Sequence, residues 1–176
     1  ATKAEVSASV KQAMKDVLAP NGKTPIDPIL TGALVGGPTP WMDVAQKYMG
    51  TKEGDANHKK ICSAAGINES QPWCGAFVCA MLKEGGVDTG TWASSQEPAS
   101  SVNFVKLNEP TYGAIVVFAK VGSTGDIGAQ GHAGFYAGIS PKGMKLLGGN
   151  QGKGVNEVTI WERPIERPGK DKLVGY

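Results

Sequence analysis

The first half of the chain has apolar residues at helical spacing in four segments. This spacing predicts helices over residues 2–18, 40–49, 57–65 and 74–84. Each predicted helix runs into a stop signal. The stops are the turn at residues 19–22, Gly50, Gly66 and the pair Gly85-Gly86. Thr39 and Pro40 suit the cap and first turn of the second helix, so the main domain is expected to begin there.

After residue 110 the apolar positions form short runs separated by glycine-rich turns. These runs predict strands over 114–119, 132–137, 144–147 and 155–160, with a short last strand over 173–176. Residues 121–130 are expected to form a loop, and Gly148-Gly149 is expected to end the third strand. Helices followed by antiparallel strands indicate an α+β fold, in which N-terminal helices pack on an antiparallel sheet.

Prolines and glycines divide the chain into two parts. Residues 1–38 are expected to be an N-terminal helix followed by a Pro/Gly-rich linker, and residues 39–176 to be the main domain. The helix over 2–18 either packs on the domain or docks a partner. The apolar segment from Ile29 to Val35 is expected to be packed against another surface and not free in solvent.

Composition and charge exclude several classes of protein. The chain has 176 residues, 40% of them hydrophobic, and a formal net charge of +2 without a basic cluster, so no nucleic-acid binding is expected. No apolar run is long enough for a membrane span. Lys3, Glu5 and Lys11 stand where the apolar core of a signal peptide would lie. The protein is expected to be a monomer.

The cysteines and histidines do not form a metal-binding pattern. The three cysteines are too few for a disulfide framework, although one pair could still bridge. There is no Cys-x-x-Cys motif, and the two histidines, His58 and His132, are far apart in the chain. No metal is therefore expected.

Cys74 is the candidate nucleophile because it follows Pro72-Trp73 and opens a predicted helix. Backbone N–H groups and the dipole at a helix start stabilise an anion, so the thiol is expected to shift toward thiolate. The same N–H groups could hold an oxyanion. Cys79 lies among apolar residues and is expected to be core, and Cys62, beside Ile61, is expected to be core or half-buried.

His132 is the candidate base because flanking glycines allow other groups to approach its ring. His58 is interpreted as a solvated helix residue. Asn150 follows the strand expected to pair with the His132 strand, so its side chain could hold the imidazole in a Cys-His-Asn arrangement. Asn150 could instead only supply a turn.

Four motifs in order resemble the CHAP/NlpC superfamily of papain-like cysteine hydrolases that cut cell-wall amides. They are Pro40-Trp41-Met42-Asp43-Val44-Ala45, Pro72-Trp73-Cys74-Gly75-Ala76-Phe77-Val78, Gly131-His132-Ala133-Gly134-Phe135-Tyr136 and Leu147-Gly148-Gly149-Asn150-Gln151. The resemblance covers residues 39–176 and is nearest to phage lysins and delivered bacterial toxins. It implies a papain-like/CHAP fold.

The resemblance also implies roles for particular residues. Cys74 would be the nucleophile, His132 the base and Asn150 the orienting residue, with an acyl-enzyme on Cys74 and no organic cofactor. Many members of the superfamily carry Glu two residues before an Asn, where this chain has Gly148. Trp73, Gln151 and Trp92 are the candidate substrate-binding residues.

Several questions stay open at this point. The amide bond that is cut could be the one cleaved by an N-acetylmuramoyl-L-alanine amidase or one cleaved by a peptidoglycan endopeptidase. Action at the cell wall or in the periplasm would need delivery by lysis machinery or a secretion system, and an immunity or delivery protein is a possible partner. The alternatives are a papain-like amidase or transpeptidase acting on protein, and a non-catalytic wall-binding module.

Overall fold

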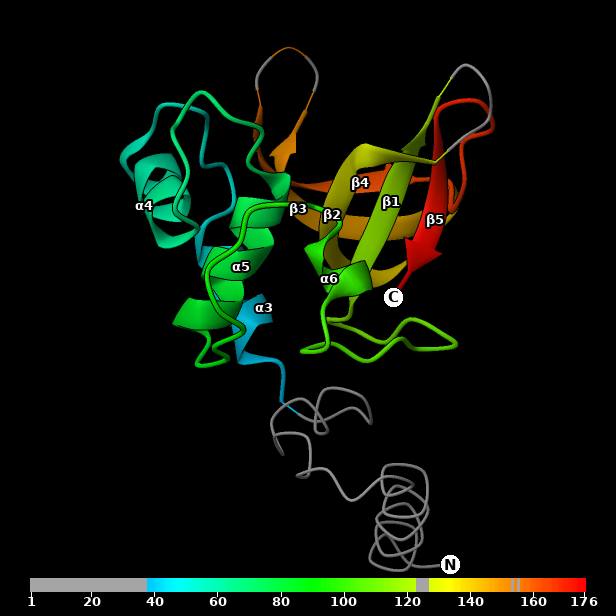
Figure 1. Ribbon diagram of the computed structural model, residues 1–176, viewed down its shortest axis with the longest axis horizontal. Helices are drawn as coiled ribbons and strands as arrows, with labels where there is room; N and C mark the ends of the chain where they lie inside the picture. Colours follow the sequence, from blue (N-terminus) through cyan, green and yellow to red (C-terminus); the bar gives the residue numbers. More distant parts are fainter. Residues whose placement is uncertain (1–37, 123–126, 153, 155) are drawn as a thin grey trace, which may run out of the picture.

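A computed structural model describes residues 38–122, 127–152, 154 and 156–176, with the side chains of 127–129 left aside. The fold is α+β, as the sequence predicts, and Figure 1 shows α3, α4 and α5 gathered on one side of the sheet. The elements are α3 (Pro40–Lys47), α4 (Ala56–Ala64), α5 (Cys74–Glu84), α6 (Glu97–Ser100), β1 (Ile115–Val121), β2 (Ile127–Ser140), β3 (Gly143–Gln151), β4 (Glu157–Arg163) and β5 (Asp171–Gly175).

Three of the predicted helices are confirmed, and their ends follow from glycine. α3, α4 and α5 stop shortly before Gly50, Gly66 and Gly86, which have φ angles of 80°, 70° and 87°. Glycine adopts this left-handed region without steric cost, so the chain can turn away from the helix there. The short helix α6 was not predicted, because four residues are too few for a periodic signal. The helix expected over residues 2–18 and the linker lie outside the described residues.

The sheet is open and antiparallel, with the strand order β4-β3-β2-β1-β5. All five predicted strands are present, but two were predicted too short. β2 begins at Ile127, inside the stretch expected to be a loop, and β3 continues through Gly148-Gly149 to Gln151. Gly149 lies so close to the Trp73 ring that a Cβ there would be 2.4 Å from it. Gly149 therefore serves the packing of helix on strand, and the glycine pair does not end the strand.

The main core lies between α5 and one face of the sheet. Every residue of α5 from Cys74 to Leu82 is buried. The strands contribute Ala133, Phe135, Leu147 and Val158 to this core. Because side chains alternate along a strand, the neighbouring positions face the other side of the sheet.

A second, smaller core lies on that other face. It contains Val116, Phe118, Met144 and Leu146. Arg163 of β4 stacks on the Phe118 ring at 3.6 Å and pairs with Asp171 of β5. Since β4 and β5 are opposite edges of the sheet, this contact requires the sheet to curl around the second core.

Candidate active site

Cys74 opens α5, as the sequence predicts, and the chain crosses tightly beside it. Trp73 is the residue before the helix, and no side chain caps the helix start. A Cβ on Gly75 would lie 2.1 Å from the carbonyl oxygen of Ala93. Glycine at position 75 therefore lets the segment around Ala93 run directly over the start of the helix.

The sulfur of Cys74 lies among hydrogen-bond donors but is nearly closed off from water. The backbone N–H groups of Ala133, Gly75 and Cys74 and the hydroxyl of Ser95 interact with it. The residue is 6% exposed. Burial raises the pKa of the Cys74 thiol, and the four donors offset this only in part. The expected shift toward thiolate is therefore wrong for the protein without substrate, because desolvation outweighs the helix start.

His132 lies on β2 directly opposite Phe118 of β1, so the two side chains share the face of the second core. Its ring meets the Trp161 ring edge to face, with the centroids 5.9 Å apart. Burial lowers the pKa of His132 to about 4, although a hydrogen bond to Gln151 acts in the opposite direction and nearby Arg163 adds to the lowering. The imidazole is therefore neutral at pH 7.

Gln151 determines which ring nitrogen of His132 carries the proton. The Nε2 amide group of Gln151 lies 3.3 Å from the carbonyl oxygen of Leu146 and 2.8 Å from that of Thr159, and donates to both. Its Oε1 then faces Nε2 of His132 at 2.8 Å. An amide oxygen only accepts, so His132 Nε2 must be the donor and Nδ1 is left without a proton. Nδ1 is therefore the ring atom able to take one.

Asn150 does not make this contact, and its expected place beside the imidazole belongs to Gln151. Asn150 has a φ of 58°, in the left-handed region. Between Gly148 and Gln151 the pairing of β3 with β4 shifts by one residue, which is a β-bulge. The bulge turns Gln151 toward His132. Asn is among the few residues that tolerate this backbone conformation, so the turn interpretation of Asn150 fits the structure better than the orienting one.

The side chains expected to line a substrate groove are buried. Trp73 is 1% exposed, Gln151 3% and Trp92 8%. Trp73 packs against Gly149, and Trp92 donates to the Thr89 hydroxyl at 3.0 Å. Large aromatic side chains bury much apolar area, so their positions beneath the surface follow from the core.

His58 is also buried, so the expectation of a solvated side chain is wrong. Its ring packs edge to face on Trp73, with the centroids 4.8 Å apart. Its Nδ1 accepts a hydrogen bond from the Gly54 N–H at 3.0 Å, and its Nε2 lies 3.4 Å from Cys62 Sγ. Cys62 and Cys79 are confirmed as core residues, 1% and 0% exposed.

The candidate nucleophile and base meet at the backbone of residues 132 and 133. The sulfur of Cys74 lies on the helix side, against the Ala133 N–H, whereas the His132 ring lies on the face of the second core. Among the hydrogen bonds of the described residues, none joins Cys74 Sγ to the His132 ring. The structure therefore brings the thiol to the backbone of the residue next to His132, and leaves the imidazole engaged with Gln151.

Sequence reasoning missed two groups of residues around this site. Ser95 contacts the sulfur from a loop that carries no motif. Trp161 and Arg163 reach the His132 surroundings from β4, and only their alternation along a strand could have suggested a shared face. Their place next to His132 depends on the curl of the sheet, which local patterns do not encode.

The described residues contain no group of three or more His, Cys, Asp or Glu side chains placed to hold a metal ion. In the same part of the chain, no helix is long and apolar enough to cross a bilayer. No family model, curated protein or solved structure matches the chain.

Proposed function

We propose that the chain is a cysteine-dependent peptidoglycan amide hydrolase with a papain-like domain, in which Cys74 attacks and His132 acts as base. The observation that supports this best is a helix-start thiol in contact with the backbone N–H of Ala133, next to a histidine whose ring is held by the amide of Gln151. Peptidoglycan as the substrate rests on the resemblance of the four motifs.

The protonation states suggest the order of events. Both groups are neutral at rest, because burial raises the pKa of Cys74 and lowers that of His132. Substrate attack requires Nδ1 of His132 to come within hydrogen-bond distance of Cys74 Sγ, and the thiol proton then passes to Nδ1 as Sγ forms its bond to the substrate carbonyl carbon. The new imidazolium keeps its Nε2–H on Gln151 and carries the added positive charge.

The remaining steps regenerate the starting state. The imidazolium gives its proton to the leaving amine as the C–N bond breaks, which leaves an acyl group on Cys74. Water then attacks the acyl carbon, with His132 taking a proton from the water and returning one to the sulfur. The N–H groups of Cys74 and Gly75, already gathered at the helix start, are the donors suited to the oxyanion.

The test is release of soluble muropeptides from purified sacculi by the wild type and by three cysteine variants. Cys74→Ala is expected to abolish release while the circular dichroism spectrum stays unchanged. Cys79→Ala and Cys62→Ala serve as matched controls, because each removes a buried thiol outside the site and costs at most stability.

Other outcomes would point to other functions. Wild-type turnover in Cys74→Ala would contradict the nucleophile assignment. Binding to sacculi without release of fragments would indicate a wall-binding module. Activity on a protein panel but not on sacculi would indicate a papain-like protein amidase or transpeptidase.

A further inference from the structure

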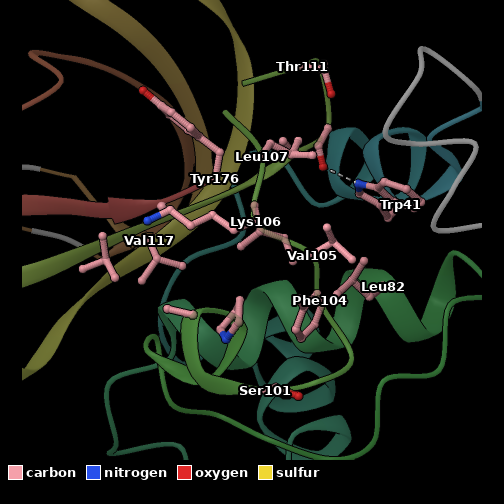
Figure 2. A pocket seen from close by; sticks show the side chains of 17 residues that line it. Trp41, Leu82, Ser101, Phe104, Val105, Lys106, Leu107, Thr111, Val117 and Tyr176 are labelled. Carbon is pink, nitrogen blue, oxygen red and sulfur yellow. Dashed lines mark hydrogen bonds between the residues drawn. The ribbon is translucent and has the colours of Figure 1, made fainter. Parts of the chain in front are cut away.

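An apolar cavity of about 240 Å³ lies between α5, the segment after α6 and the strands β1 and β5 (Figure 2). Figure 2 shows Trp41, Leu82 and Phe104 on the helical side and Val117 and Tyr176 on the strand side. The charged side chain among the lining residues is Lys106. Such an apolar hollow favours an apolar occupant.

None of the candidate catalytic residues lines the cavity. Leu82 lies eight residues after Cys74 on α5, and this distance corresponds to about 12 Å along a helix. The cavity is also smaller than the range of about 300–1,000 Å³ common for small-molecule sites. A few apolar side chains would fill it better than a cell-wall fragment.

The described chain begins at the rim of this cavity. Trp41 and Gly113 both line it, and Trp41 Nε1 donates to the Gly113 carbonyl at 2.9 Å. A Cβ on Gly113 would lie 2.7 Å from Cγ2 of Thr39, so Thr39 packs on the same rim. Whatever precedes Thr39 in the chain is therefore tethered beside the opening.

The apolar stretch that precedes Thr39 in the sequence is close enough along the chain to enter the cavity. Residues 29–35 read Ile-Leu-Thr-Gly-Ala-Leu-Val and carry no charge. Val35 is four residues from Thr39, and four extended residues span at most about 14 Å. The tether makes the local concentration of this stretch at the opening far higher than that of any free partner.

We propose that residues 29–35 of the same chain occupy this cavity, with Leu30 and Leu34 as the buried side chains. The segment is covalently held at the rim, is apolar like the lining and lacks a charge that would oppose burial. This proposal does not rest on the proposed function, because it is argued only from the tether and the apolar lining.

Methyl-labelled full-length protein tests the contact directly. Nuclear Overhauser effects are expected between the methyl groups of Leu30 or Leu34 and those of Leu82 or Val117. A sample that mixes two labelling patterns separates contacts within one chain from contacts between chains. Cross-peaks between chains would assign the cavity to a second copy, and absence of any cross-peak would overturn the proposal outright.

Two pairs of variants of the full chain give an independent readout. Ala99→Trp places a ring at the mouth of the cavity and is expected to abolish these cross-peaks, whereas Ser100→Trp, at the next exposed position, which does not line it, is expected to keep them. Leu34→Asp is expected to lower the melting temperature by a few degrees, whereas Lys23→Asp, in the same extension but outside the apolar stretch, leaves it unchanged. Equal melting temperatures for Leu34→Asp and the wild type would contradict the proposal.

Discussion

At the scale of single residues, Gln151 is the side chain on which the proposed base depends. Replacing it with Leu keeps most of its volume but removes the acceptor of His132 Nε2–H. The ring can then change tautomer, and kcat is expected to fall on the order of 10- to 1000-fold, or about 1.4–4 kcal/mol. KM is expected to change little, because the role is in orientation.

Steady-state kinetics on one defined muropeptide measure this effect, and ¹⁵N shifts of the His132 ring report the tautomer. Gln46→Leu, an exposed position on α3, is the matched control. An unchanged ring tautomer in Gln151→Leu would show that the amide does not orient the imidazole.

The low pKa of His132 predicts how activity depends on pH. The base must be neutral, so kcat/KM is expected to hold from pH 7 downward and to fall with a midpoint near the pKa of about 4. If kcat/KM instead falls with a midpoint near 6.5, the ordinary pKa of histidine, the His132 ring is more hydrated than its burial implies. The measurement is a pH–rate profile with the fold monitored at each pH.

The lowered pKa of His132 also makes the free energy of unfolding depend on pH. The unfolded chain takes up a proton at His132 near pH 6.5, whereas the folded chain does so only near pH 4. The free energy of unfolding is therefore expected to fall as pH drops from 6.5 to 4, by at most about 3 kcal/mol. Urea unfolding at several pH values checks this, and His132→Gln, neutral throughout, is expected to remove that part of the slope.

At the scale of elements, the β-bulge at the end of β3 separates the roles of Asn150 and Gln151. Asn150→Gly is expected to keep both stability and kcat, because glycine accepts the φ of 58°. Asn150→Val is expected to cost about 1–2 kcal/mol of unfolding free energy, since a β-branched residue is strained there. Kinetics and urea unfolding of both variants decide the matter, and a large loss of kcat in Asn150→Gly would return the orienting role to Asn150.

Local patterns were sufficient for most of the elements but not for the contacts between them. α5 was predicted with its observed ends, because a proline before Cys74 and glycines after Glu84 mark both boundaries. The bulge was not predicted, because it depends on a one-residue slip between two strands. That slip turns Gln151 and not Asn150 toward His132. The sequence could therefore propose Cys74 and His132 as candidates, but it could not predict which side chain contacts the His132 ring.

At the scale of the whole molecule, an ion pair joins the two edge strands of the curled sheet. Arg163 is 1% exposed and Asp171 is 7% exposed. Burial by itself would raise the pKa of Asp171, but hydrogen bonds from Arg167 and Arg163 bring it below its usual value. The carboxylate of Asp171 is therefore the counter-charge of both arginines.

Asp171→Asn is expected to destabilise the fold by about 3–5 kcal/mol, because it leaves the buried Arg163 cation without its counter-charge. The double variant Arg163→Met with Asp171→Leu is expected to recover most of this loss, since it removes both charges together. Urea unfolding of the two proteins is the measurement. Equal losses in the single and double variants would show that the packing of these side chains, and not their charge, holds the edges together.

The burial of Cys74 beneath Ser95 also has a consequence for oxidative damage. Peroxide attacks thiolates, and sulfur oxidised beyond the sulfenic acid is lost for catalysis. A thiol that stays protonated and 6% exposed is a poor target for this reaction. Under the proposed mechanism the reactive form of the sulfur appears only when substrate arrives, so slow oxidation of Cys74 by peroxide is expected in the free protein.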